Sequence, residues 1–210
     1  FSSHMSNDCL GYAGLDQPAK LIDRSLYDQI SKTDYRKSLF NGPEGDKTAS
    51  ADTPGAARPY ASRKFGFMAQ WLQDYIYMRA SEMVLIEAES YARLGDGAKA
   101  ASVLGELMAK RDIAWKSASV TVDDVLLQRR IELWGEGHGY YDLRRNGKGI
   151  DRNYEGTNHT PANRIKVPAH DNLWWFQLPL KEITENDMIS EDEQNPWTKK
   201  QDDDKDDKED

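Results

Sequence analysis

Residues 128–145 read QRRIELWGEGHGYYDLRR, a run of charged, glycine and aromatic residues where an ordinary amphipathic helix would repeat leucine and alanine. Just before the run, Thr121 and Asp124 have the spacing of a capping box, in which two side chains satisfy the free amides at the start of a helix. Hydrophobic residues then recur at helical spacing and predict a buried stripe, formed by Leu127, Ile131 and Trp134. The run therefore predicts a helix that is unusually charged outside this stripe.

The other face of this helix carries Arg129, Glu132 and Glu136 at spacings of three and four. Exposed ion pairs at these spacings stabilise a helix by only ~0.2–0.5 kcal/mol each, which is too little to explain so dense a pattern. We therefore predict that these charges are buried or half-buried. Their expected partners are one another, or Arg79 and Glu82 of a preceding helix.

Three glycines, Gly135, Gly137 and Gly139, alternate in the second half of the run. Each would cost about 1 kcal/mol relative to alanine inside a helix. Either the helix ends here or another backbone approaches closely, and both interpretations predict a crowded junction.

The run resembles the arginine-rich stretch of the SusD/RagB family of outer-membrane glycan-binding lipoproteins, although Gln128 and His138 depart from the family pattern. Other segments match in the family's order: residues 34–37 (DYRK), residues 79–89 (RASEMVLIEAE), and a closing pattern of residues 176–180 (FQLPL), 182–183 (EI) and 194–196 (QNP). Trp197 and Thr198 stand where the family has the glycine and tyrosine that complete the closing pattern. Together these segments cover most of the chain.

This resemblance implies a mainly α fold of tetratricopeptide-like helix hairpins, with long irregular loops and little β structure. It also implies that residues 1–198 are the C-terminal part of a SusD-like domain in a longer chain. Residues 199–210 are expected to form an acidic, disordered tail, because residues 201–210 hold seven acidic side chains and two lysines and such a block repels itself. A calcium site is disfavoured there, because the tail lacks the turn glycine and closing glutamate of an EF-hand.

The family's function is cell-surface binding of an oligosaccharide or polysaccharide and its delivery to a SusC-like, TonB-dependent outer-membrane transporter. The resemblance therefore implies a protein on the outer membrane of a Gram-negative bacterium that faces the cell surface. Its lipid anchor would lie in an N-terminal part absent from this sequence, and Cys9 is interpreted as a buried or incidental thiol. A net charge of −8 argues against binding to nucleic acid, which needs a basic face. No apolar run approaches the ~20 residues that span a bilayer.

The pattern along the chain predicts a helix hairpin between residues 75 and 109. The first helix is expected over residues 75–94, Gly95 ends it, and Asp96 caps the next helix. That second helix has an apolar stripe of Ala100, Val103, Leu104, Leu107 and Met108. Tetratricopeptide geometry is favoured, although the consensus residues of that repeat are absent.

Elsewhere the expected elements are shorter. Pro18 suits the first turn of a helix ending near Thr33, whose stripe is Leu21, Ile22, Leu26 and Ile30. Residues 41–60 form a long loop, residues 146–171 are irregular, and residues 173–178 are predicted to be a short strand. If that strand forms, one of Trp174 and Trp175 should face outward.

Catalysis is not expected. The sequence contains no metal-ligand spacing of histidines, nucleophile elbow, phosphate-binding loop or dinucleotide fingerprint. Glu132 and Glu136, or Glu87 and Glu89, could be proposed as a glycosidase pair. Carboxylates this close on one helix do not flank a substrate cleft, so structural ion pairing is the better interpretation. We expect no enzyme activity, cofactor or metal.

Aromatic residues in polar loops are the candidates for binding a sugar by ring stacking. Tyr12, Tyr60 and Trp71 are expected to form an exposed platform, with Asn7 and Arg58 donating hydrogen bonds to sugar hydroxyl groups. By contrast, Trp115 and Trp134 fall on or beside helix stripes and are interpreted as packing residues. Core packing of Trp71 remains an equal alternative.

Two other functions stay open from the sequence. The hairpin also fits a helical-repeat protein-interaction adaptor that binds no glycan. A glycan-active enzyme is the third possibility and is disfavoured by the missing catalytic pattern.

Overall fold

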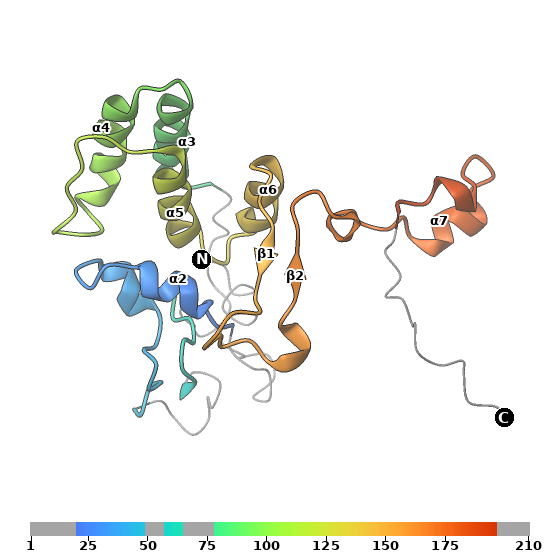
Figure 1. Cartoon of the computed structure of the whole chain (residues 1–210), viewed down its shortest axis with the longest axis horizontal. Coiled ribbons are helices and arrows are strands. Elements are labelled where there is room, and N and C mark those ends of the chain that lie inside the picture. Colours follow the sequence, from blue (N-terminus) through green and yellow to red (C-terminus); the bar gives the residue numbers. More distant parts are fainter. Residues whose placement is uncertain (1–19, 49–56, 65–77, 197–210) are drawn as a thin grey trace, which may run out of the picture.

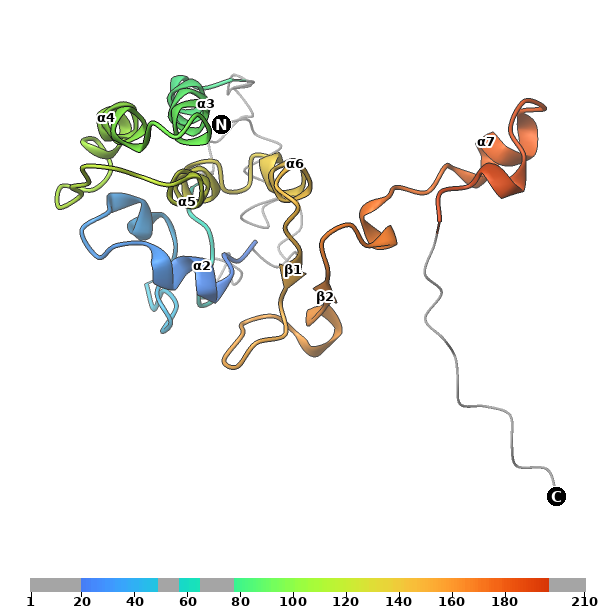
Figure 2. The same cartoon turned by 45° about the horizontal axis from the view of Figure 1, so that its top comes forward.

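The computed structural model describes residues 20–48, 57–64 and 78–196 of the chain. In this part the fold is mainly α, as expected, and a single two-stranded sheet is its regular β structure. The α-helices are α2 (Arg24–Gln29), α3 (Ala80–Arg93), α4 (Gly97–Met108), α5 (Val122–Glu132), α6 (His138–Arg145) and α7 (Leu180–Glu185). Helices α2 to α6 form the body, whereas α7 lies on an arm apart from it in both views (Figures 1 and 2).

The predicted hairpin is confirmed by α3 and α4, although α3 begins only at Ala80, after the non-helical Met78 and Arg79. Gly95 has a φ of +84°, a left-handed conformation that glycine adopts readily and that ends α3. The Asp96 side chain then accepts a hydrogen bond from the amide of Lys99 and caps α4. The apolar stripe predicted for α4 is buried against Leu85 and Ala88 of α3.

Helix α5 lies between this hairpin and α2 (Figure 2) and contributes to two cores. Val125 belongs to the core of the hairpin, whereas Ile131 belongs to a second core with α2. The helix begins with the predicted capping box of Thr121 and Asp124. Because α5 packs against both cores, it is the central element of the body.

The glycine-rich segment after α5 ends the helix, which was one of the two interpretations. Gly135 and Gly137 have φ values of +77° and +87°, and α6 starts at His138. The expected crowding is wrong at Gly137 and Gly139, because a Cβ added at either residue would meet no atom within 4 Å. Left-handed backbone, not close packing, accounts for the glycine at Gly137.

The helix expected from Pro18 is much shorter than predicted, and Pro18 lies outside the described residues. Asp23 caps α2 by accepting hydrogen bonds from the amides of Ser25 and Leu26, so the helix starts only at Arg24. Leu21 instead forms a β-bridge with Ala61. The hydrophobic residues of the stripe are still used, since Ile22, Leu26 and Ile30 are buried in the second core.

The irregular stretch after α6 contains a small antiparallel ladder. Strand β1 (Ile150–Asp151) pairs with β2 (Lys166–Val167), with Ile150 opposite Val167. The strand expected over residues 173–178 is wrong. Asn172–Trp174 form a 3-10 helix capped by Asp171, and Leu178 pairs with the side chain of Gln194 instead of a neighbouring strand.

The two tryptophans of this segment nevertheless differ in exposure as predicted, since Trp174 is buried and Trp175 is 48% exposed. Across the described ranges, no helix has the length and apolar character needed to cross a bilayer.

Candidate functional site

A carboxylate on α5, Glu132, lies at the centre of a buried cluster of charges. Its side chain is 3% exposed and accepts hydrogen bonds from three arginines. The shortest hydrogen bond to the Glu132 carboxylate is 2.9 Å from Arg111, 3.0 Å from Arg79 and 3.2 Å from Arg36. Burial raises the pKa of Glu132, but the hydrogen bonds and positive charges outweigh it and lower the pKa from 4.5 to about 2.

Glu136 extends the cluster beyond the end of α5. Arg79 donates to both of its carboxylate oxygens, at 2.9 and 2.7 Å. Lys64 donates to Glu136 at 2.5 Å and to the carbonyl oxygen of Trp134 at 2.8 Å. Burial lowers the pKa of the Lys64 ammonium more than its acidic neighbours raise it. These contacts fix the chain at the α5–α6 junction.

One turn before Glu132, the Arg129 side chain joins α5 to α3 and α6. Its Nε donates to Asp142 of α6 at 2.8 Å, and its Nη2 lies 3.6 Å from Glu82 of α3 and 3.3 Å from Nδ1 of His138. The prediction of a buried charge network linking α5 to the preceding hairpin is therefore confirmed.

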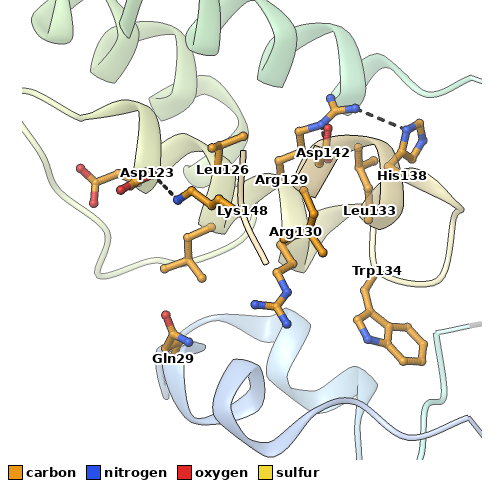
Figure 3. Close-up of a pocket in the computed structure, with 14 residues that line it drawn as sticks. Gln29, Asp123, Leu126, Arg129, Arg130, Leu133, Trp134, His138, Asp142 and Lys148 are labelled. Carbon is orange, nitrogen blue, oxygen red and sulfur yellow. Dashed lines mark hydrogen bonds and ion pairs between the residues drawn. The ribbon is translucent and has the colours of Figure 1, made fainter. Parts of the chain in front are cut away.

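A pocket of about 530 Å³ lies between α2, α5 and α6 (Figure 3). Leucine side chains form its apolar part: Leu126, Leu127, Leu133 and Leu143. Polar groups stand at its edges. Arg130 reaches from α5 toward Gln29 of α2, and Trp134 lies at the far end from the ion pair of Lys148 with Asp123 (Figure 3).

The guanidinium of Arg130 is exposed and makes no hydrogen bond or ion pair within the described part of the chain. Its five N–H donors are therefore available to a ligand. Gln29 donates to the carbonyl of Ser25 at 2.8 Å through its amide nitrogen, which leaves its amide oxygen as an acceptor. An apolar floor with polar groups at the edge suits a ligand that has both apolar faces and hydroxyl groups.

The carboxylates around the pocket are poor candidates for acid–base catalysis. Asp142 is paired with Arg129, and Asp123 with Lys148. Hydrogen bonds from the Thr121 hydroxyl and amide lower the pKa of Asp124. A general acid needs a raised pKa, so this arrangement favours binding over bond cleavage. The described residues contain no group of three or more side chains suited to hold a metal.

A second, smaller hollow adjoins the pocket at Lys148, which lines both. It measures about 70 Å³. Its walls come from the end of α6 and from the segment before the arm: Arg144, Gly147, Lys148, His170, Trp174 and Trp175.

The model of the SusD family matches residues 69–197 of the chain. This span covers more than half of the sequence and includes α3 to α7. The chain belongs to the SusD family. All residues around the 530 Å³ pocket except Gln29 lie within the matched span.

Solved structures from Bacteroides vulgatus have the same fold. A SusD superfamily protein is 25% identical over 93% of this chain and 43% of its own, with a TM-score of 0.70. A putative sugar-binding protein is 24% identical over 91% of this chain and 42% of its own, with a TM-score of 0.67. A SusD-like carbohydrate-binding protein is 23% identical over 80% of this chain and 41% of its own, with a TM-score of 0.60. The chain thus spans less than half the length of these relatives. No curated protein matches it.

The two departures from the SusD pattern still make polar contacts. Gln128 accepts a hydrogen bond from Arg36 at 2.6 Å, and His138 lies beside Arg129. Arg36, from the DYRK segment, is itself buried and also pairs with Asp34. Gln128 and Arg36 thus belong to the contacts around Glu132, whereas His138 belongs to the contacts of Arg129.

Of the residues proposed to contact a glycan, Tyr12, Asn7 and Trp71 lie outside the described residues. Arg58 is exposed, as its role requires, but it does not line the pocket. The expectation of an exposed Tyr60 is wrong, because this ring is 7% exposed. The backbone turns at Tyr60, which has a φ of +62°, and its ring packs edge-on against the ring of Tyr27 with 5.4 Å between the ring centroids.

Sequence reasoning missed Arg130, Lys148 and Gln29 as site residues. They come from three separate elements, so their proximity depends on the tertiary fold. One signal was present. Arg130 follows Arg129 directly, and consecutive helical residues point about 100° apart, so the two arginines could not both join one network. The packing roles predicted for Trp115 and Trp134 are confirmed by their contacts with the two cores.

Proposed function

We propose that this protein binds an oligosaccharide or polysaccharide at the cell surface, without cleaving it, and delivers it to a SusC-like TonB-dependent transporter in the outer membrane. Membership of the SusD family is the observation that carries this proposal. We further propose that residues 1–198 form the C-terminal part of a SusD-like domain. A lipid anchor would hold the protein on the outer membrane of a Gram-negative bacterium.

The 530 Å³ pocket supports a role in sugar binding. Its volume falls within the range of about 300–1,000 Å³ that is usual for small-molecule sites. A pyranose ring has an apolar face that can contact the leucines, while its hydroxyl groups can accept hydrogen bonds from Arg130 and donate one to Gln29. The loops of residues 1–15 and 41–60 are further proposed contributors through Tyr12, Asn7 and Arg58, and Trp71 is a proposed contact outside these two loops.

Calorimetric titration of the full-length protein against a panel of oligosaccharides tests the proposal. We expect binding of at least one glycan, and at least a tenfold loss of affinity in Arg130→Gln. Lys99→Gln is the matched control, since it removes an exposed cation from α4, away from the pocket. Reducing-end analysis of the same mixtures should show no cleavage.

The outcomes separate the possible sites and functions. Failure of the wild-type protein to bind any glycan would refute the proposed function. Binding that survives Arg130→Gln but is lost in Tyr12→Ala or Trp71→Ala would place the site in the loops instead of the pocket. New reducing ends would identify an enzyme.

A protein-interaction adaptor is the second candidate, because Met83 and Ile86 expose apolar surface on the outer face of α3. Affinity purification from detergent-solubilised membranes separates the two candidates. Recovery of a β-barrel transporter with a plug domain would support delivery of a glycan to SusC. Recovery of a soluble protein, together with absent glycan binding, would support the adaptor.

A further inference from the structure

The small hollow beside Lys148 is strongly cationic for a protein with a net charge of −8. Arg144 and Lys148 carry positive charges, His170 can carry one, and no acidic residue lines it. Lys148 is partly neutralised by Asp123 at 2.5 Å. Arg144 therefore supplies most of the unbalanced charge.

Arg144 has no carboxylate partner among the described residues. Its guanidinium lies over the ring of Trp175 at 4.9 Å and near the ring of Tyr140 at 5.8 Å, and one N–H group donates to the Tyr140 hydroxyl at 3.2 Å. Stacking occupies the faces of a guanidinium and leaves the N–H groups at its edge free to bind an anion in a bidentate manner. The end of α6 carries only about half a negative charge, so it does not cancel this arginine.

The walls of the hollow are fixed by specific contacts. The Tyr140 hydroxyl donates to the carbonyl oxygen of Trp174, and the Trp174 indole donates to that of Pro168 at 2.6 Å. Gly147 permits a close approach of His170, since a Cβ at this glycine would lie 3.2 Å from its Nε2. The Tyr140 and Trp174 side chains that border Arg144 are therefore held in place before any ligand arrives.

Exposed rings border the hollow. Trp175 is 48% exposed and Phe176 is 74% exposed, and Phe176 packs at 5.2 Å from Tyr140. A volume of about 70 Å³ is several times the ~10–15 Å³ that one water needs, enough for the few heavy atoms of a carboxylate or sulfate but not for a pyranose ring. An anionic group could enter the hollow while the ring that bears it remains outside, against the exposed indole.

We propose that this hollow binds the anionic substituent of an acidic sugar, either the carboxylate of a uronic acid or a sulfate ester, while the sugar ring stacks on Trp175. Arg144 and His170 are the proposed contacts of the anion. Lys148 borders both cavities, so the same oligosaccharide can continue into the 530 Å³ pocket. This inference rests on the proposed glycan binding and specifies an acidic ligand.

Titration of the full-length protein with paired ligands tests the role of charge alone. One arm uses oligomers of galacturonic, mannuronic and glucuronic acid against their methyl esters, and a second uses sulfated galactose oligomers against desulfated ones. Neutral gluco- and xylo-oligosaccharides complete the panel. We expect an acidic form to bind at least ten times more tightly than its neutral counterpart, and the preferred arm identifies the anion.

Variants then locate the preference. Arg144→Gln and His170→Asn should bring the acidic-to-neutral affinity ratio close to one, whereas Arg144→Lys should retain part of it. Asparagine is chosen because it tolerates the φ of +62° at His170. Lys99→Gln, which removes a cation near the Tyr91 ring on the hairpin, should leave the ratio unchanged. Circular dichroism checks that each variant is folded.

Equal binding of charged and neutral forms, or binding of neutral glycans only, would overturn this inference and leave the proposed function standing. A charge preference that survives in both Arg144→Gln and His170→Asn would also overturn it. Absence of binding to the whole panel would instead refute the proposed function itself.

Discussion

Replacement of Glu132 by alanine should destabilise the protein more than almost any other single change on α5. The side chain is 3% exposed and accepts hydrogen bonds from Arg36, Arg79 and Arg111. After Glu132→Ala, Arg36 and Arg79 keep other acidic partners. Within the described residues, Arg111 would keep only a 3.5 Å contact with the Lys110 carbonyl as a hydrogen bond. Its charge would be stranded in a half-buried place.

Two estimates of the magnitude agree. Removal of one partner from a buried ion pair typically costs about 3–5 kcal/mol. Independently, the fall in the pKa of Glu132 from 4.5 to about 2 corresponds to about 3 kcal/mol at ~1.4 kcal/mol per pKa unit. For a chain of this length, such a loss in the free energy of unfolding lowers the thermal midpoint by roughly 6–20 °C.

Urea unfolding followed by circular dichroism measures this loss. Glu87→Ala is the matched control, because Glu87 is an exposed glutamate on α3 with no ion pair in the described chain. It should change the free energy of unfolding by no more than about 0.5 kcal/mol. Equal midpoints for Glu132→Ala and Glu87→Ala would show that the cluster contributes nothing to stability and would refute the reasoning.

The same carboxylate gives a pH dependence with a definite sign. Its pKa is lower in the folded protein than in the unfolded chain, so its contribution is complete above pH 4.5 and is lost as the pH falls toward 2. Glu132→Gln removes this titration. The difference in free energy of unfolding between wild type and Glu132→Gln should therefore shrink by about 3 kcal/mol between pH 5 and pH 2. A constant difference across this range would contradict the lowered pKa.

Two further predictions concern other parts of the chain. Gly137→Ala should destabilise the protein by about 1–2 kcal/mol, because alanine disfavours the φ of +87°. Gly139→Ala should stabilise it by up to about 1 kcal/mol, because Gly139 lies in helical backbone with open space around it. Thermal melts of both variants check these opposite signs, and equal shifts in the thermal midpoint would contradict the backbone explanation. Deletion of residues 201–210 should leave the thermal midpoint within a few degrees of wild type, because a self-repelling acidic block buries little surface; a larger drop would indicate that the tail is docked.

Local signals in the sequence predicted the central elements. The Thr121–Asp124 capping box, the left-handed Gly95 and the stripe of α4 each depend on residues close together in the chain, so each could be read without the tertiary structure. The charge network was also predictable, because its density exceeded what exposed helical pairs could explain. Arg79 and Glu82 could be predicted as its partners only because the sequence also shows the second charged helix to which they belong.

The wrong predictions share a different cause. Tyr60 lies among glycine, proline and polar residues, which are typical of exposed loops, yet a left-handed turn directs its ring against Tyr27. Residues 173–178 have the composition of a strand, but no neighbouring strand is present in the described fold, and Gln194 satisfies the Leu178 backbone instead. In both cases long-range contacts decided the outcome, and a local pattern holds no information about them.

Arg129, Asp142 and His138 of the charge network line the 530 Å³ pocket, whereas Glu132 does not, so the roles of Glu132 and Arg130 can be separated. Arg129 joins α5 to α6 through Asp142, while the adjacent Arg130 points into the pocket (Figure 3). The network thereby fixes the helix from which Arg130 projects and the helix that ends at Arg144. Variants of Glu132 should consequently lose stability and affinity together, whereas Arg130→Gln and Arg144→Gln should lose affinity while the free energy of unfolding stays nearly unchanged. A stability loss in Arg130→Gln as large as that of Glu132→Ala would assign Arg130 to the scaffold instead of the binding surface.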